Sequence, residues 1–219
     1  MTPLTPEVRA VLDALLLGLQ AALGPDLVGL YLRGSLALGD FDPVTSDIDF
    51  LAVTERPVSE VQFAALAGLH VRLAALPSAY ARRLEGAYID RTSLRRFGPG
   101  EQRHPAVGSD WAFGWGELEG DWVLERWIVR ERGVILWGPD PRTLIEAITA
   151  PELQAAVRGQ LRWWVALPDR PGWLLRRGEQ AFATKTMCRA LFTLKRVNCR
   201  ASPAPSPGRW GRCRERGAP

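Results

Sequence analysis

The sequence has little cysteine and no long hydrophobic run, and each shortage excludes a class of protein. Three cysteines among 219 residues, Cys188, Cys199 and Cys213, are too few and too scattered for a disulfide framework or a zinc site. No apolar run looks long enough to span a bilayer. The apolar stretch at 14–19 lacks the basic flank and the cleavage site of a signal peptide. A cytoplasmic protein is therefore the default expectation.

An excess of positive charge on the folded part of the chain is also missing. The net charge is +4, but residues 196–219 contain six arginines and one glutamate, which leaves the remainder slightly negative. This distribution argues against nucleic acid as a partner. The hydrophobic fraction of 47% and the charged fraction of 24% are those of an ordinary globular protein.

The first part of the chain alternates between helical and β-strand patterns. Thr5 and Pro6 predict the start of a helix that Gly24 ends. Ser59, with Gln62 three residues later, predicts a second helix with a capping box. Its expected buried stripe is Val61, Ala65, Leu69, Leu73 and Leu76. Strands are expected at 27–32, 48–53 and 84–89.

In the second part of the chain an irregular stretch is followed by helical patterns, and only helical segments are expected after a linker. Residues 95–110 are irregular, and a helix is expected over 122–132 with a stop at Gly133. The Gly-Pro-Asp-Pro stretch at 138–141 is a linker signal. Further helices are expected at about 142–149, 151–166 and 174–195. We therefore predict an α/β domain (1–140), a small helical domain (141–195) and an irregular basic tail (196–219).

Two aspartates, Asp47 and Asp49, flank Ile48 on the second predicted strand. Side chains alternate across a strand, so both carboxylates should point to one face, with their backbones roughly 6–7 Å apart. Glu85, on the next predicted strand, is the natural third carboxylate. Hard oxygen ligands of this kind suit Mg²⁺, which also takes phosphate oxygens of a substrate.

Gly34 and Ser35 come where the first strand ends and a short helix at 36–38 is expected. Glycine lets the backbone approach a phosphate closely, free N–H groups can bind the anion, and Ser35 adds a hydroxyl donor. Either motif alone is common by chance. The order of strand, Gly-Ser, loop, Asp-x-Asp, helix and a strand with Glu85 is far more restrictive. It predicts nucleotidyl transfer, in which metal ions polarise the α-phosphate and neutralise the leaving pyrophosphate.

Several segments resemble one known family. GLYLRGSLALGDFDPVTSDIDFLAV and LEGAYID resemble the nucleotidyltransferase-fold proteins of the streptomycin/spectinomycin (aminoglycoside) adenylyltransferase group. DWVLERWIVRERGVILWGPDPRTLI and TKTMCRALFTLK are similar to its later segments. The resemblance covers roughly residues 5–195. It implies a polymerase-β-like domain with a mixed sheet, followed by a helical domain.

The resemblance also implies an activity and a set of site residues. ATP and Mg²⁺ would bind between the two domains, and AMP would pass to a hydroxyl of an aminoglycoside-type acceptor, an antibiotic-resistance reaction. By position, Ser35 and Ser46 would contact phosphate, Asp47 and Asp49 would bind metal, and Glu85 would act as general base. The family often has His or Tyr where this chain has Arg33, which could face phosphate or turn away.

The acceptor side of the site is less defined in the sequence. Eight of the nine tryptophans lie between Trp111 and Trp173, among several acidic residues. Acidic groups beside aromatic faces would suit a polycationic sugar. The alternative is packing by tryptophan plus a solvated acidic face. Asp121 and Glu179 are the preferred acceptor contacts, since they correspond to the acidic acceptor-side region of the resembled family. We expect a monomer.

The tail departs from the resembled family, which continues with a G-E-x-x-S-K-P turn, a nucleotide-contacting lysine and further helices. Residues 196–219 contain four prolines and three glycines instead. One hypothesis is out-of-frame translation, because a frame that starts at the third base of the Arg196 codon permits GELPSKPRAIAWALG. The alternative is a genuine disordered basic tail.

Three functions stay open at this point. The first is a Mg²⁺-dependent adenylyltransferase of a small cationic acceptor. The second is an inactive or nucleotide-binding remnant that lacks the C-terminal part of the site. The third keeps the chemistry with a protein or another small-molecule acceptor; a tRNA end is disfavoured by the charge of the folded part.

Overall fold

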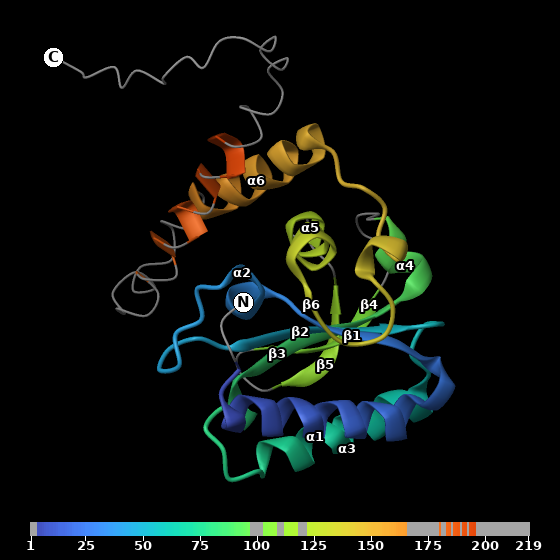
Figure 1. Ribbon diagram of the computed structural model, residues 1–219. Coiled ribbons are helices and arrows are strands. Elements are labelled where there is room, and N and C mark those ends of the chain that lie inside the picture. The colour runs from blue at the N-terminus through green and yellow to red at the C-terminus, as the bar shows by residue number, and fades with distance from the viewer. Residues whose placement is uncertain are drawn as a thin grey trace, which may run out of the picture.

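The computed structural model describes residues 4–96, 103–108, 112–117, 122–165 and parts of 180–195. Helices cover both faces of one sheet: α1 and α3 lie side by side below it, and α2, α5 and α6 lie above it (Figure 1). The helices are α1 (Pro6–Leu23), α2 (Gly34–Leu38), α3 (Glu60–Ala74), α4 (Arg91–Arg95), α5 (Trp122–Arg132) and α6 (Ala150–Val165). Short 3₁₀ turns occupy η1 (Gly24–Asp26), η2 (Ala81–Arg83) and η3 (Pro141–Thr143).

The sheet is mixed, with six strands in the order β5-β4-β3-β2-β1-β6 among the described residues. Its strands are β1 (Leu27–Leu32), β2 (Ile48–Thr54), β3 (Leu84–Asp90), β4 (Arg103–Val107), β5 (Phe113–Glu117) and β6 (Val134–Trp137). Of the pairings between these described strands, that of β2 with β3 alone is parallel, and α3 forms the crossover between the two. The α/β fold with a mixed sheet is confirmed.

The first helix forms as its sequence predicts. The Thr5 side chain accepts a hydrogen bond from the Val8 N–H and so caps α1. The buried residues of α1 are Val8, Val11, Leu12, Leu15, Leu19 and Leu23. By length and composition the segment Pro6–Asp26 could also cross a membrane, so the expectation that no run was long enough was wrong. A core helix gives the same signal, and the six buried side chains of α1 belong to the core below the sheet.

The helix α3 has the predicted cap but not the predicted buried face. Ser59 and Gln62 make both hydrogen bonds of the capping box. Val61, however, is 81% exposed, and Ala65 is exposed as well. The buried residues are Leu66, Leu69, His70 and Leu73. At 3.6 residues per turn Val61 lies about 140° from Leu66 around the helix, so the two cannot share one face.

Three strands were not predicted, and one predicted helix is absent. The segment expected to be irregular contains β4, whose His104 is a buried strand residue, and β5 and β6 form the two edges of the sheet. Residues 144–149 are not helical, although Leu144 and Ile145 are buried. Their apolar character reflects packing of an irregular segment against the upper face of the sheet.

The two faces of the sheet have separate cores. The larger core packs α1 and α3 against residues such as Phe50 and Tyr88. The smaller core lies on the opposite face and contains Tyr31, Leu51 and Val129. Because side chains alternate along β2 and β3, Asp49 and Glu85 lie on the face of this smaller core, beside α2 and α5.

Candidate active site

The carboxylates are brought together by the register of the two parallel strands. Asp49 of β2 is the direct partner of Glu85 of β3. Asp47 comes one residue before β2 begins and is exposed, whereas Asp49 is half-buried. Residues two apart on an extended chain point to the same side, so all three carboxylates are directed to the same end of the upper face.

Gly34 holds the backbone of α2 directly against Asp49. Its φ is +58°, a conformation that side chains disfavour. A Cβ at this position would lie 1.9 Å from Asp49 Oδ2, which is less than any non-bonded contact allows. Both the backbone and the space therefore require glycine here. The predicted glycine lies where the sequence places it, although α2 begins at Gly34 and not at residue 36.

The Ser35 hydroxyl lies at the start of the same short helix. Its oxygen is buried and has no hydrogen-bond partner among the described residues. A buried hydroxyl without a partner costs free energy, so such groups in folded proteins usually await a ligand or water. The position of Ser35 is consistent with the predicted role in binding an anion.

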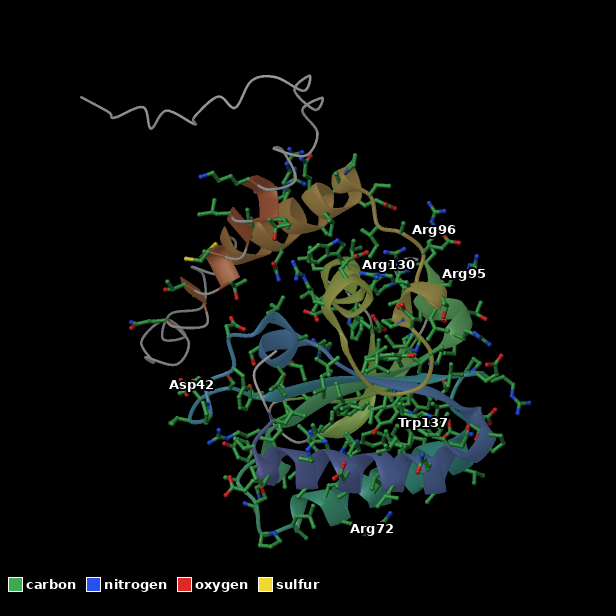
Figure 2. The ribbon with its side chains drawn as sticks, viewed as in Figure 1. Asp42, Arg72, Arg95, Arg96, Arg130 and Trp137 are labelled. Carbon is green, nitrogen blue, oxygen red and sulfur yellow. The ribbon has the colours of Figure 1, made fainter. Side chains whose placement is uncertain are left out.

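Ser46 closes the loop that leads into the carboxylate strand. Its hydroxyl accepts a hydrogen bond of 3.0 Å from the Asp42 N–H, and its own N–H donates to the Asp42 carbonyl at 2.8 Å. Asp42, labelled in Figure 2 on the loop after α2, also binds Val44 and Thr45. The Ser46 hydroxyl proton remains available as a donor beside Asp47.

Arg33 does not turn away from the carboxylates, and its contact with phosphate stays a prediction. Its Nη1 donates to Glu125 Oε2 at 2.7 Å and lies 3.7 Å from Asp49 Oδ1. The guanidinium also lies over the Trp122 ring, 5.6 Å from its centroid. Burial opposes the charge on Arg33, but Glu125 and Asp49 outweigh burial and raise its pKa. Arg33 is therefore a fixed cation among the carboxylates.

Glu125 and Trp122 of α5 are the site residues that sequence reasoning missed. The sequence placed them only within an acidic, tryptophan-rich segment. Glu125 is 92 residues from Arg33 along the chain, and no local pattern links the two. The only available signal was that an arginine so close to an Asp-x-Asp strand needs a compensating carboxylate.

Asp47 has a different electrostatic environment from Asp49. Loss of hydration raises the pKa of the Asp47 carboxyl, and the charge of Arg83 opposes this rise. The Arg83 side chain donates a 3.0 Å hydrogen bond to the Pro43 carbonyl, which lies in the loop that leads into β2. A bound cation beside Asp47 would oppose the effect of desolvation.

The oxygen atoms of these carboxylates are the ligand type that a hard divalent cation prefers, and the strand register places Asp49 beside Glu85. The side chains do not, however, converge on one point. Among the described residues no three His, Cys, Asp or Glu side chains form a group that could hold a metal ion. Asp49 and Glu85 are nevertheless strand partners, and glycine at position 34 keeps the neighbouring helix clear of Asp49. Oxygen donors of this type fit Mg²⁺.

The predicted acceptor contacts cannot be placed. Asp121 and Glu179 both lie outside the described residues, as does the tail at 196–219. The described part of the tryptophan-rich segment contributes Trp122, whose ring faces Arg33.

A comparison with known protein families supports a reaction class for this part of the chain. Residues 16–93 match the family model described as nucleotidyltransferase domain, and this range contains Gly34, Ser35, Asp47, Asp49 and Glu85. Residues 16–93 are thus similar to a nucleotidyltransferase domain, and the chain is a transferase enzyme. No curated protein matches the chain at a significant level.

One solved structure supports the fold. The chain is similar to the spectinomycin adenyltransferase AAD(9) from Enterococcus faecialis, crystallised with ATP and spectinomycin. Sequence identity is 18%, the match covers 86% of this chain and 76% of that chain, and the TM-score is 0.68. A toxin-antitoxin crystallised with AMP-PNP matches at 17% identity, with 84% and 99% of the chains covered and a TM-score of 0.33. At that score the second match carries no argument.

Proposed function

We propose that this protein transfers AMP from ATP to a hydroxyl of a small, aminoglycoside-like acceptor and releases pyrophosphate. The observation that carries the proposal is the pairing of Asp49 with Glu85 on adjacent strands, with Gly34 in contact with Asp49. This arrangement combines general-base and phosphate-binding groups within one short stretch of the upper face. The nucleotidyltransferase domain matched over 16–93 supports the reaction class.

The chain's own groups can be assigned to the steps of the reaction. Glu85 would accept the proton of the acceptor hydroxyl, whose oxygen then forms a bond to the α-phosphorus of ATP. The bond between the α-phosphorus and the bridging oxygen breaks at the same time, and the electron pair leaves with pyrophosphate. The Ser35 and Ser46 hydroxyls and the backbone at Gly34 would bind the phosphate oxygens.

The three carboxylates would hold the metal ion that nucleotidyl transfer commonly uses. Asp47, Asp49 and Glu85 are the proposed ligands of Mg²⁺, which would neutralise charge on the phosphates when bound. Because the site has an arginine in contact with Asp49, its metal affinity is not set by the carboxylates alone.

The acceptor class is the finer part of the proposal. The similar structure AAD(9) was crystallised with spectinomycin, which supports a small hydroxylated acceptor. We propose Asp121 and Glu179 as acidic groups that would bind the cationic part of such a molecule. A protein side chain and other small molecules are the alternative acceptors.

An acceptor screen tests the proposal. The full chain would be incubated with Mg-ATP and single aminoglycosides, including streptomycin and spectinomycin, and assayed for pyrophosphate and for an AMP-modified product by mass spectrometry. We expect one AMP per product molecule, and loss of transfer in Glu85→Gln. Binding of ATP by calorimetry without transfer to any acceptor would overturn the proposal and support the inactive remnant.

A further inference from the structure

We infer that Arg33 is a built-in counter-cation of the carboxylate site, and that it competes with the divalent metal ion for Asp49. The strength of this competition is set by Glu125, which holds the same guanidinium from the opposite side. The inference rests on the proposed metal site. It assigns to Arg33 and Glu125 a role in determining metal affinity.

The contacts of Arg33 show that its position is determined by two elements, β2 and α5. Its Nε donates to the Phe50 carbonyl of β2 at 3.4 Å, and its Nη1 donates to Glu125 of α5 at 2.7 Å. The Trp122 ring of α5 covers its guanidinium plane. Only 14% of the Arg33 side chain is exposed. A long side chain held at so many points is not a mobile surface group.

The charge balance explains why such a cation is needed. Asp49, Glu85 and Glu125 all act electrostatically on Arg33, and each raises its pKa. Three partly buried carboxylates in one region would repel one another strongly without a compensating charge. Within the described part of the chain, the Arg33 guanidinium approaches Asp49 to 3.7 Å.

The two ion pairs of Arg33 differ in length. This difference favours replacement of the guanidinium by a metal ion at Asp49. The contact with Glu125 is a direct hydrogen bond of 2.7 Å, whereas the contact with Asp49 is longer, at 3.7 Å. A divalent cation at Asp49 would repel the guanidinium, which can give up the longer contact and keep the shorter one. Glu125 therefore lowers the cost of admitting the metal, and Arg33 raises it.

A charge-swap series with direct measurement of metal binding tests this inference. Mn²⁺ would be titrated calorimetrically into the full chain without nucleotide. Arg33→Met keeps an apolar side chain over Trp122 and should tighten Mn²⁺ binding roughly tenfold, because one repelling charge is removed. Glu125→Gln should weaken it roughly tenfold, because the guanidinium is left to Asp49. The double variant should bind Mn²⁺ within about threefold of Arg33→Met, because Glu125 acts through a guanidinium that is no longer present.

Matched controls separate this role from a purely structural one. Arg91 forms a comparable, half-exposed pair with Glu55 at 3.0 Å, and these two residues follow the ends of β2 and β3, whereas Asp49 and Glu85 lie near the starts of the same strands. Arg91→Met should leave the Mn²⁺ affinity unchanged. The thermal shift produced by saturating Mn²⁺ should be larger in Arg33→Met than in the wild type, because metal replaces the missing charge.

The outcomes distinguish a failure of the proposed metal site from a failure of the role assigned to Arg33 and Glu125. If the wild type does not bind Mn²⁺, or Asp49→Asn binds it equally well, the proposed metal site is wrong and the inference with it. If binding depends on Asp49 but is the same in Arg33→Met and Glu125→Gln, the inference is wrong and the metal site stands. Should Arg33→Met fail to fold, the weakened binding expected of Glu125→Gln still decides the matter.

Discussion

Two glycines at the ends of α2 make a matched pair of single-residue tests. Gly34 and Gly39 both have positive φ, at +58° and +82°. A Cβ at Gly34 would strike the Asp49 carboxylate, whereas a Cβ at Gly39 meets nothing within 4 Å. Gly34→Ala and Gly39→Ala should each lose about 1–2 kcal/mol of unfolding free energy from backbone strain. Only Gly34→Ala should also displace Asp49.

The readouts for this pair are denaturant unfolding and ATP-dependent pyrophosphate release. Gly39→Ala should keep its turnover at temperatures where it is folded, and Gly34→Ala should lose most of its turnover even when folded. Equal activity in the two variants would show that close packing of α2 on Asp49 is not needed for the reaction.

The residues of the site were predictable to the extent that they lie in local motifs. Gly34 follows the end of a predicted strand, and Asp49 and Glu85 lie on predicted strands. The strand register pairs Asp49 with Glu85, and Gly34 lies against Asp49. The ion pair of Arg33 with Glu125 was not predictable, because it joins segments 92 residues apart through tertiary packing alone.

At the scale of elements, buried hydrogen bonds from two arginines hold α5 in place. Arg126 is 4% exposed and donates to the carbonyls of Leu94 and Arg95 at the end of α4. Arg130, one turn later, donates to the Ile145 carbonyl at 3.1 Å. Arg95 and Arg130 are both labelled on the upper side of the sheet in Figure 2. Burial lowers the pKa of Arg126 to about 10, so this cation is costly and needs its acceptors.

Removing this anchor should destabilise the protein and loosen the site. Arg126→Met leaves carbonyls at the end of α4 without their donors and should cost roughly 1–3 kcal/mol in urea unfolding. Arg132→Met, on the exposed part of the same helix, should cost less than about 0.5 kcal/mol. A similar small loss in both variants would mean that α5 is held by apolar packing alone.

The elements that sequence analysis missed are the ones with the weakest local signals. β4 contains Pro105, β5 contains Gly114 and Gly116, and β6 has only four residues directly after a helix stop. These strands form because neighbouring strands supply their hydrogen-bond partners. By contrast, α1 and α3 carry their own caps, and β1, β2 and β3 are largely apolar and mostly buried. The domain boundary at 140/141 remains a prediction.

For the molecule as a whole, we expect the buried His70 to make the free energy of unfolding depend on pH. His70 is 3% exposed, and its Nε2 lies 2.7 Å from the Tyr88 hydroxyl. Burial lowers the pKa of His70 from 6.5 to about 4. The unfolded chain therefore takes up the proton more readily, and stability should fall as the pH drops from 6.5 towards 4. The share of His70 is on the order of 3 kcal/mol.

The measurement is urea unfolding of the wild type and of His70→Phe across this pH range. His70→Phe should lose less stability on acidification than the wild type. His104, whose pKa is also lowered by burial, should account for part of the remaining dependence. Identical pH profiles for wild type and His70→Phe would show that His70 is not held neutral in the folded state.

The central claim is that the Gly34–Asp49–Glu85 arrangement catalyses nucleotidyl transfer, and one comparison tests it most directly. Pyrophosphate release from Mg-ATP, with the acceptor identified by the screen, would be measured for the wild type and for Asp49→Asn under identical conditions. We predict that Asp49→Asn reduces turnover by roughly 100-fold or more, because an anion that would hold the metal is lost. Its circular dichroism spectrum should be unchanged. Full turnover in a correctly folded Asp49→Asn variant would contradict the account.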